Sequence, residues 1–317
     1  MIKLEELRSE FKRGNIDKRL YWQIVRENYT RILPQLTKLI KENSEVISVE
    51  LRKDGVILKK ASGILLFFDF KQFFCRAEVQ LLMEGDPEKD DMVFISNYLN
   101  NYEDSTMLDI GANVGIFSLD FYKRHRGIKY YLFEPIPDTF LGLQKNAKLN
   151  LVDEENYMPF NIGMSDEKES FNFYVPSSNE AASMVANEDV FYRKRATEDG
   201  DLTGSNEIDK IECKVETVDD FVKEHSVRNI SFIKIDVEGN ELKVLKGAAK
   251  TILENKPLIY CELLRKHAKR FGYHPNDVIK LMHGYGYVCK TMRNGKLEMI
   301  NEVTEDTVET NFFFLIE

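Results

Sequence analysis

The sequence predicts an α/β protein with a mainly parallel β-sheet and helices on both of its faces. From about residue 105 onward, short apolar segments of strand length alternate with segments of helical period, which is typical of βαβ units. The first of these strands runs directly into a turn with two glycines, as in open sheets that bind a ligand at the ends of their strands. With 317 residues, of which 43% are hydrophobic and 31% charged, the chain can form one large domain or two smaller ones.

The N-terminal part has a different pattern. Apolar residues recur at helical spacing in the first 45 residues and predict a helical extension. From Val46 onward, apolar and polar residues alternate around Asp54-Gly55, which indicates a β-hairpin, and a helix over Met92–Leu99 follows. We therefore expect three regions: a helical extension (1–45), a hairpin and helix lead-in (46–104), and the main domain (105–317).

The main domain is predicted to contain five strands before its C-terminal end. They cover Met107–Ile110, Lys129–Phe133, Tyr157–Met164, Ile230–Ile235 and Pro257–Glu262. Helices are predicted between them at Val114–Arg124, Thr139–Asn150 and Glu241–Leu253. The chain ends with a turn at Asn294-Gly295 and the apolar segment NFFFLIE, which together predict an antiparallel pair at one edge of the sheet.

Charge and composition argue against several classes of protein. The formal net charge is −9 and no block of Lys and Arg forms a basic stripe, so we expect no nucleic-acid partner. The N-terminal MIKLEELRSEFKR alternates charges where a signal peptide has an apolar core, and the apolar run GILLFF is too short to cross a bilayer. We therefore expect a cytoplasmic location and no membrane span.

The four cysteines are scattered along the chain, at Cys75, Cys213, Cys261 and Cys289. No close pair among them suggests a zinc site or a redox dithiol. We expect buried structural thiols.

The glycine turn itself indicates the kind of ligand. The strand before it ends at Asp109-Ile110, and a dinucleotide turn of the G-x-G-x-x-G type would then need glycine at positions that hold Asn113 and Ile116. The glycine that admits a pyrophosphate is missing. What remains suits a nucleoside-like ligand with a smaller polar tail, whose carboxylate takes the exposed N–H groups while Asp109 faces a positive group.

The second strand adds an acidic residue at its own end. Glu134 follows Asp109 by 25 positions, near the spacing at which a carboxylate accepts hydrogen bonds from both hydroxyls of a ribose. An adenosine with an amino-acid tail meets both demands, and S-adenosylmethionine is such a molecule. The competing interpretation is that Asp109 and Glu134 only cap the helices that follow them.

Five segments resemble one family in order and in content. LDIGANVG, FEPIPDTF, NIGMSD, FIKIDVEGNELKVLKGA and PLIYCE together resemble the FkbM family of S-adenosylmethionine-dependent methyltransferases, over roughly residues 46 to 317. The resemblance implies a Rossmann-like, seven-stranded class I methyltransferase sheet with an antiparallel last strand. It also implies O-methylation of sugars or natural products.

On this resemblance the cofactor site lies around the glycine turn. Asp109 and the turn would contact the methionine part, Glu134 the ribose, and the NIGMSD turn the adenine. The expected cofactor-binding residues are Asp109, Gly111, Ala112, Asn113, Gly115, Glu134, Pro135, Gly163 and Ser165.

Three further carboxylates are candidates for the chemistry. Asp236 and Glu238 follow the fourth strand and Glu262 ends the fifth, so they should meet at one rim of the sheet. Crowded carboxylates raise one another's pKa, which can produce a base, and their oxygens could also hold magnesium or calcium. Alternatively, Glu238 and Asp236 only stabilise the N-terminus of the next helix.

Two other residues near these carboxylates keep two interpretations each. His267 could serve as the base, although a surface histidine in a basic segment is usually inert. Lys234 could neutralise the carboxylates or lie on the opposite face of the sheet.

An acceptor-binding lid is expected beyond the third strand, at Ser177–Met184 and in the polar stretch 187–210, with plain disorder as the alternative. Aromatic residues near it could stack on a sugar ring, unless Phe171 and Phe173 turn into the core and leave Tyr174; these candidates are Phe171, Phe173, Tyr174, Phe191 and Tyr192.

The predicted function is that of an S-adenosylmethionine-dependent O-methyltransferase acting on a sugar hydroxyl of a glycan or glycosylated metabolite. The alternative from another class is a non-catalytic nucleotide-binding subunit of a biosynthetic complex. A nicotinamide-dependent oxidoreductase is disfavoured by the missing glycine at 113. The acceptor, the oligomeric state and the need for a metal stay open.

Overall fold

The structure is a computed structural model that describes residues 4–29, 37–38, 40–42, 45–68, 81, 88–102, 104–176 and 208–317. The lid expected at 177–184 and most of the loop expected at 187–210 lie outside the described residues. Phe191, Tyr192 and Cys75 lie outside them too. Residues 208–210 begin a strand instead of ending a loop.

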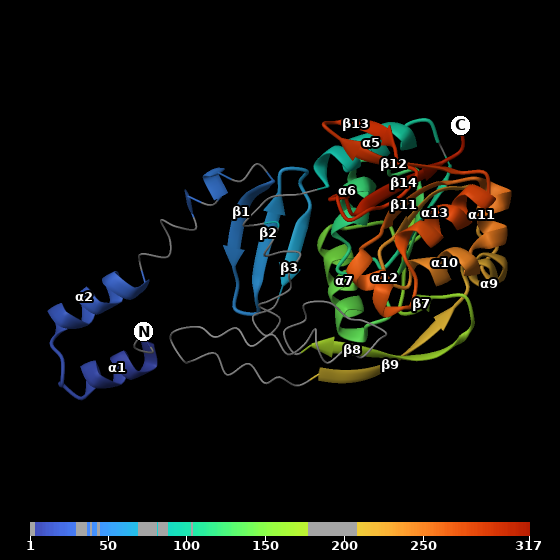
Figure 1. Cartoon of the computed structure of the whole chain (residues 1–317). Helices are drawn as coiled ribbons and strands as arrows, with labels where there is room; N and C mark the ends of the chain where they lie inside the picture. Colours follow the sequence, from blue (N-terminus) through green and yellow to red (C-terminus); the bar gives the residue numbers. More distant parts are fainter. Residues whose placement is uncertain are drawn as a thin grey trace.

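The main sheet is mixed and follows the predicted architecture (Figure 1). Its strand order is β13-β12-β14-β11-β10-β4-β5-β6, with parallel pairing from β6 to β11. The strands are β4 (Thr106–Ile110), β5 (Lys129–Phe133), β6 (Tyr157–Phe160), β10 (Ile230–Ile235), β11 (Leu258–Glu262), β12 (Val288–Arg293), β13 (Lys296–Met299) and β14 (Asn311–Leu315). The last strand, β14, is antiparallel to both neighbours, as expected.

The sheet has eight strands in the described residues, one more than the predicted seven. The Asn294-Gly295 turn joins β12 and β13 into a hairpin, so β13 extends the edge. The strand β14 inserts between β11 and β12.

The third predicted strand, Tyr157–Met164, is divided. The strand β6 ends at Phe160, and β7 (Gly163–Met164) joins a second sheet with β8 (Glu169–Pro176) and β9 (Ile208–Glu216). The break lies at Asn161, whose side chain donates to the carbonyls of Glu134 and Pro135 at 2.9 Å each. This side-chain contact turns the backbone away from the main sheet.

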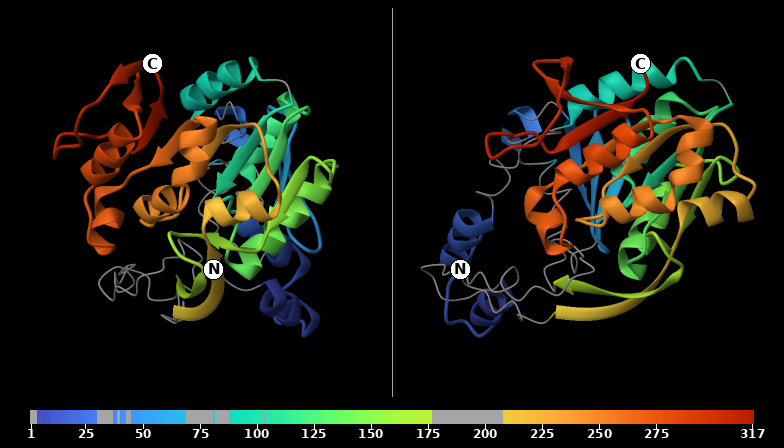
Figure 2. Two further views of the ribbon diagram at one scale, coloured as in Figure 1. Left: turned by 90° about the vertical axis from the view of Figure 1, so that its right-hand side faces the viewer. Right: turned by 45° about the vertical axis from the view of Figure 1, so that its right-hand side comes forward.

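Helices cover both faces of the main sheet (Figure 2). One face carries α5 (Lys89–Leu99), α6 (Ile116–Arg124) and α7 (Pro137–Leu149). The other carries α9 (Val218–Glu224), α10 (Glu241–Gly247), α11 (Ala249–Asn255) and α13 (Pro275–Gly284). The short helix α12 (Arg265–Arg270) follows β11.

The helix predicted at Glu241–Leu253 is two helices, α10 and α11, which meet at the buried Ala248. Just before this break, α10 lies so close to the backbone of Ser165 that a Cβ on Gly247 would come within 2.0 Å of the Ser165 carbonyl oxygen. The break between α10 and α11 therefore lies next to the place where Gly247 packs against the backbone of Ser165.

The N-terminal part forms two helices and a small sheet. The helices α1 (Leu4–Lys12) and α2 (Lys18–Tyr29) lie apart from the main sheet, beyond β1–β3 (Figure 1). The hairpin of β1 (Val46–Leu51) and β2 (Val56–Lys60) forms as predicted, and β3 (Leu65–Phe68) extends it. Apolar residues of this sheet share a core cluster with α6 and α7.

Within the described residues, no helix is long and apolar enough to cross a membrane. Cys213, Cys261 and Cys289 are buried free thiols, as expected.

Candidate active site

The glycine turn brings the ends of β4 and β10 together. Gly111 has φ +83°, and a Cβ at this position would come within 1.8 Å of the Asp236 carbonyl oxygen. Gly115, at the start of α6, has φ +85°, and Asn113 between them has φ +50°. Only glycine fits at 111, because any side chain would collide with backbone.

Asp109 is buried directly beneath this turn, with 1% of its surface exposed. Its Oδ2 accepts a hydrogen bond from the Ser118 hydroxyl of α6. Its Oδ1 has no hydrogen-bond donor in the described residues, and Lys234 Nζ lies 3.6 Å away. Burial raises the pKa of Asp109, although Lys234 and Ser118 oppose the shift.

Glu134 closes the turn from the end of β5. Its Oε2 accepts from the backbone N–H of Asn113 at 3.1 Å, and its Oε1 accepts from that of Ile136 at 2.9 Å. The second bond goes to the residue just before α7 and not to an N–H of the first turn of that helix, so the carboxyl closes the loop after β5 and does not cap α7. Burial raises the pKa of Glu134 to about 7.

Lys234 lies on the same face of the sheet as the carboxylates. Its Nζ lies 3.1 Å from Asp236 Oδ2 and donates to the Gly111 carbonyl at 3.3 Å. Burial lowers the pKa of Lys234, but the carboxylates of Asp236 and Asp109 outweigh it and raise the pKa above its ordinary value. The positive group that Asp109 faces in this structure is therefore Lys234.

Asp236 and Glu262 meet at the ends of β10 and β11. Burial and the neighbouring charge of Asp236 raise the pKa of Glu262 to about 10. Glu262 consequently keeps its proton at neutral pH.

The loop after β10 places Glu238 against His267 of α12. His267 Nδ1 lies 2.8 Å from Glu238 Oε2, and Glu238 has φ +56°. The backbone of this loop is held by Glu241, whose carboxylate accepts from the Gly239 N–H at 2.8 Å and from the Tyr273 hydroxyl at 2.7 Å. His267 is therefore in contact with one of the predicted carboxylates and is not isolated on the surface.

Comparisons with known proteins can be set against this geometry. The model of the methyltransferase FkbM domain matches residues 109–289, which is more than half of the chain. The chain belongs to the FkbM methyltransferase family. The matched range runs from Asp109 to Cys289 and includes all the sequence-predicted site residues.

Individual relatives of this FkbM-family chain are distant. Methyltransferase 1 of Beauveria bassiana is 26% identical over 147 residues, which are 46% of this chain and 59% of that protein. The hexuronic acid methyltransferase AglP of Haloferax volcanii is 27% identical over 180 residues, which are 57% of this chain and 62% of that protein. The matches thus span less than two thirds of these relatives.

Among solved structures, a methyltransferase FkbM from Methylobacillus flagellatus is 16% identical, with a TM-score of 0.43. The match covers 92% of this chain and 60% of the chain of that structure.

The remaining residues that the sequence predicted near the cofactor or the acceptor of this FkbM-family chain have the following surroundings. Ala112 is buried in the turn, and Gly163 packs against Pro135 and Val215. Ser165 is fully buried against Gly247 of α10, and its hydroxyl donates to Asp166 at 3.2 Å. Phe173 is buried in a small cluster of β8 and β9, and Phe171 packs against it, which supports their assignment to the core.

No group of three or more His, Cys, Asp or Glu side chains in the described part of the chain is arranged to hold a metal ion. Instead, Asp236 is paired with Lys234, Glu238 contacts His267, and Glu262 neighbours Asp236.

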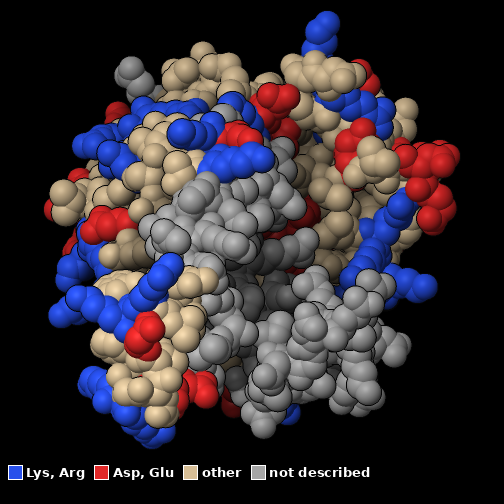
Figure 3. Space-filling view, turned by 90° about the vertical axis from the view of Figure 1, so that its left-hand side faces the viewer, with Lys and Arg blue, Asp and Glu red and all other residues tan. Residues whose placement is uncertain are grey.

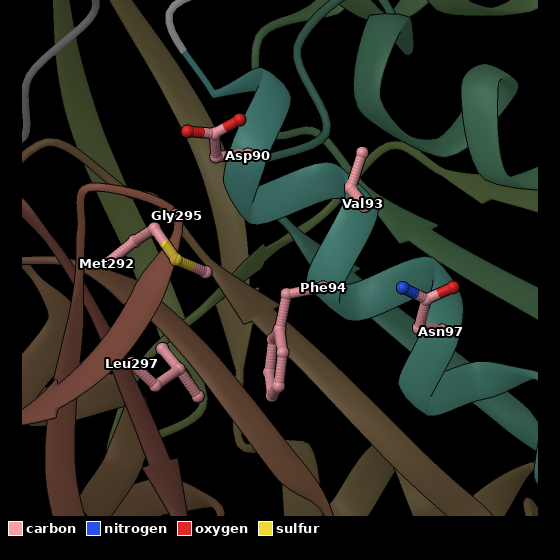
Figure 4. A pocket seen from close by; sticks show the side chains of 7 residues that line it. All are labelled: Asp90, Val93, Phe94, Asn97, Met292, Gly295 and Leu297. Carbon is pink, nitrogen blue, oxygen red and sulfur yellow. The ribbon is translucent and has the colours of Figure 1, made fainter.

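A separate apolar pocket of about 270 Å³ lies between α5 and the β12–β13 hairpin (Figure 4). Its lining residues are Asp90, Val93, Phe94, Asn97, Met292, Gly295 and Leu297. The side chains of Phe94 and Met292 face each other across it. None of the predicted site residues lines this pocket.

The face on the side of α1 and α2 carries charges of both signs, with Asp and Glu beside the places where Lys and Arg gather (Figure 3).

Proposed function

We propose that this chain is an S-adenosylmethionine-dependent O-methyltransferase whose acceptor is a sugar hydroxyl of a glycan or a glycosylated metabolite. The observation that carries the proposal is that Lys234 contacts residues of both the predicted cofactor site and the predicted carboxylate group. Lys234 lies 3.6 Å from Asp109 of the glycine turn and 3.1 Å from Asp236 of the carboxylate group. A ligand on the turn and an acceptor at the carboxylates would therefore be neighbours.

The residues around the turn fit the cofactor. Asp109 offers a buried oxygen without a hydrogen-bond donor in the described residues, and Glu134 offers a buried carboxyl at the next strand end. In this proposal Asp109, Gly111, Ala112, Asn113 and Gly115 hold the methionine part. Glu134 and Pro135 hold the ribose, and Gly163 faces the adenine. When bound, S-adenosylmethionine supplies a methyl group that is already activated for transfer.

The carboxyl groups suit an acceptor with several hydroxyls. Asp236, Glu238 and Glu262 come from two adjacent strand ends and present oxygens that accept hydrogen bonds from neighbouring hydroxyls. The similarity to a hexuronic acid methyltransferase supports a saccharide acceptor. The net charge of −9 disfavours phosphorylated or nucleic-acid acceptors at long range, because like charges repel. We propose the cytoplasm as the location.

The divalent metal that the sequence left open at these carboxylates has no support within the described residues, where Asp236 is paired with Lys234 and Glu238 contacts His267. Its test is the loss of methyl transfer with a chelator and its return with magnesium. Activity that is indifferent to the chelator would remove the metal from the account.

The acceptor is tested by a mass-spectrometric screen of saccharides, including hexuronic acids, with S-adenosylmethionine as donor. We expect at least one saccharide to gain a methyl group in place of a hydroxyl hydrogen, with S-adenosylhomocysteine formed in equal amount. Asp236→Asn should reduce turnover far more than cofactor affinity, because charge is removed while shape is kept. Methylation of tRNA or of protein, with none of any saccharide, would overturn the acceptor assignment. Cofactor binding without any transfer would favour a non-catalytic subunit.

A further inference from the structure

We propose that Glu238 and His267 form a dyad in which His267 takes the proton of the acceptor hydroxyl and Glu238 positions its ring. The inference rests on the proposed function and assigns the base within that site. Its starting point is the 2.8 Å distance between His267 Nδ1 and Glu238 Oε2. Both atoms are buried, and neither forms a hydrogen bond within the described residues, so their close approach is an ion-pair contact whose alignment is not that of a hydrogen bond.

The backbone holds Glu238 in an uncommon conformation for this contact. A non-glycine residue at φ +56° costs free energy and persists where its surroundings fix it, often at functional sites. Gly239 follows at φ +117°, and a Cβ there would come within 2.7 Å of the Phe271 ring and 3.0 Å of the His267 carbonyl oxygen. The absence of that Cβ lets α12 approach the loop closely enough for the dyad to form.

Two hydrogen bonds of Glu241 hold the loop that carries Glu238 and Gly239. Its carboxylate accepts from the Gly239 N–H and from the Tyr273 hydroxyl, which comes from the segment after α12. The Gly239 bond is local to the loop, whereas the Tyr273 bond ties Glu241 to the segment that follows α12. These two bonds hold in place the segments that carry Glu238 and His267.

The neighbouring carboxyl groups are poorly suited to accept the proton. Burial and Asp236 raise the pKa of Glu262 to about 10, so Glu262 already carries a proton at neutral pH. Asp236 Oδ2 is paired with the Lys234 ammonium at 3.1 Å. The imidazole of His267, whose Nδ1 lies 2.8 Å from Glu238 Oε2, is the remaining candidate for the general base at this site.

The proposed proton transfer uses both ring nitrogens of His267. In the proposed dyad the neutral ring carries its proton on Nδ1, on the side of Glu238, and leaves the Nε2 lone pair for the acceptor. The acceptor oxygen bonds to the methyl carbon as the carbon–sulfur bond breaks, and that bond's electron pair stays on sulfur. The hydroxyl proton passes to His267 Nε2, and the Glu238 carboxylate stabilises the imidazolium that forms.

The first test compares His267→Ala with the matched control His283→Ala, an exposed histidine on α13. We expect His267→Ala to lower kcat by about 10²- to 10³-fold. The dissociation constant of S-adenosylhomocysteine should stay within about twofold of the wild-type value, because the ring has no part in cofactor binding. Free imidazole should restore at least a tenth of the lost activity. The control should leave kcat unchanged. If His267→Ala does not fold, His267→Gln replaces it in the same comparison. Unchanged kcat, or a folded variant that imidazole does not rescue, would overturn the proposal.

The second test needs no turnover. We expect the ring ¹⁵N chemical shifts of His267 in the resting protein to show the proton on Nδ1, and Glu238→Gln to change that tautomer population. A proton on Nε2 in the wild type would contradict the dyad. If the wild-type protein methylates no saccharide, the proposed function fails while the tautomer measurement still decides on the dyad.

Discussion

At the scale of single residues, Lys234 sets the charge balance of the site. Its ammonium is buried between Asp109 and Asp236 and also lies over the ring of Phe117, 5.5 Å from the centroid. A buried cation with two carboxylate partners costs less than an isolated one, because each partner compensates part of its lost hydration. The sequence left the face of Lys234 open, since its strand is buried on both sides.

Gly111 provides the sharpest prediction at this scale. Gly111→Ala should destabilise the protein by about 3 kcal/mol or more, because the added Cβ would collide with the Asp236 carbonyl and the residue has φ +83°. S-adenosylhomocysteine binding should be lost with it. The control is Gly127→Ala, where a Cβ meets no atom within 4 Å and φ is not in the left-handed region. Urea denaturation and calorimetry measure both effects. Equal stability of the two variants would refute the close approach.

Glu134 is tested through cofactor affinity. Glu134→Ala removes a carboxyl that accepts from the Asn113 N–H and, in our proposal, from the ribose. We expect the binding free energy of S-adenosylhomocysteine to weaken by about 1.5–3 kcal/mol, the usual range for hydrogen bonds to a charged group. Calorimetry gives the value directly. An unchanged dissociation constant would mean that Glu134 only closes the turn and the loop before α7.

At the scale of elements, local sequence patterns predicted strands well where burial alone defines them. The bounds of β5 and β10 are those predicted, because both are short apolar runs flanked by polar residues. The breaks at Asn161 and Ala248 were not predictable, since they depend on contacts with Glu134, Pro135 and Ser165, which are distant in sequence.

The site shows the same division between local and distant information. The strand ends predicted that Asp236, Glu238 and Glu262 lie near one another, because parallel strands share their carboxyl edge, and both other charges act on Glu262 in the structure. The pairing of His267 with Glu238 was not predictable, as it depends on how α12 packs on Gly239.

The small N-terminal sheet is joined to the main domain by side chains of α7. Asn146 Oδ1 accepts from the Phe67 N–H of β3 at 2.7 Å, and its Nδ2 donates to the Val114 carbonyl at 3.0 Å. Asn150 makes two similar bonds to the backbone of Leu65. These amides satisfy the edge of β3, which would otherwise leave buried backbone groups unpaired.

Asn146→Ala should therefore destabilise the protein by about 1–3 kcal/mol, since it leaves a buried N–H and a buried C=O without partners. Gln144→Ala, on the exposed side of the same helix, is the control and should change stability by less than about 0.5 kcal/mol. Urea denaturation of both variants measures the difference. Equal stability of the two would mean that the amide bonds do not hold β3 in place.

At the scale of the whole molecule, the pH dependence of stability reports on the crowded carboxyl groups. The folded-state pKa of Glu262, about 10, lies above the ordinary value of 4.5. Between these values the folded protein holds a proton that the unfolded chain lacks, so this group's contribution to stability falls as pH rises.

Glu262→Gln removes this dependence, because an amide does not titrate. We expect the free energy of unfolding of the variant to rise relative to that of the wild type between pH 6 and pH 9. The difference between the two should grow by on the order of 1 kcal/mol per pH unit. Glu254→Gln, at an exposed position, should show no such trend. Denaturant titrations at three pH values decide it, and a difference that stays constant with pH would contradict the raised pKa.

The most direct test of the account is calorimetric titration of the intact protein with S-adenosylhomocysteine and, separately, with NAD. The turn lacks the glycine that a pyrophosphate requires at position 113, and in our proposal the buried Asp109 and Glu134 hold an adenosine with an amino-acid tail. We predict that S-adenosylhomocysteine binds with 1:1 stoichiometry, that Gly111→Val abolishes this binding, and that NAD binds at least about 100-fold more weakly. Tighter binding of NAD than of S-adenosylhomocysteine would contradict the account.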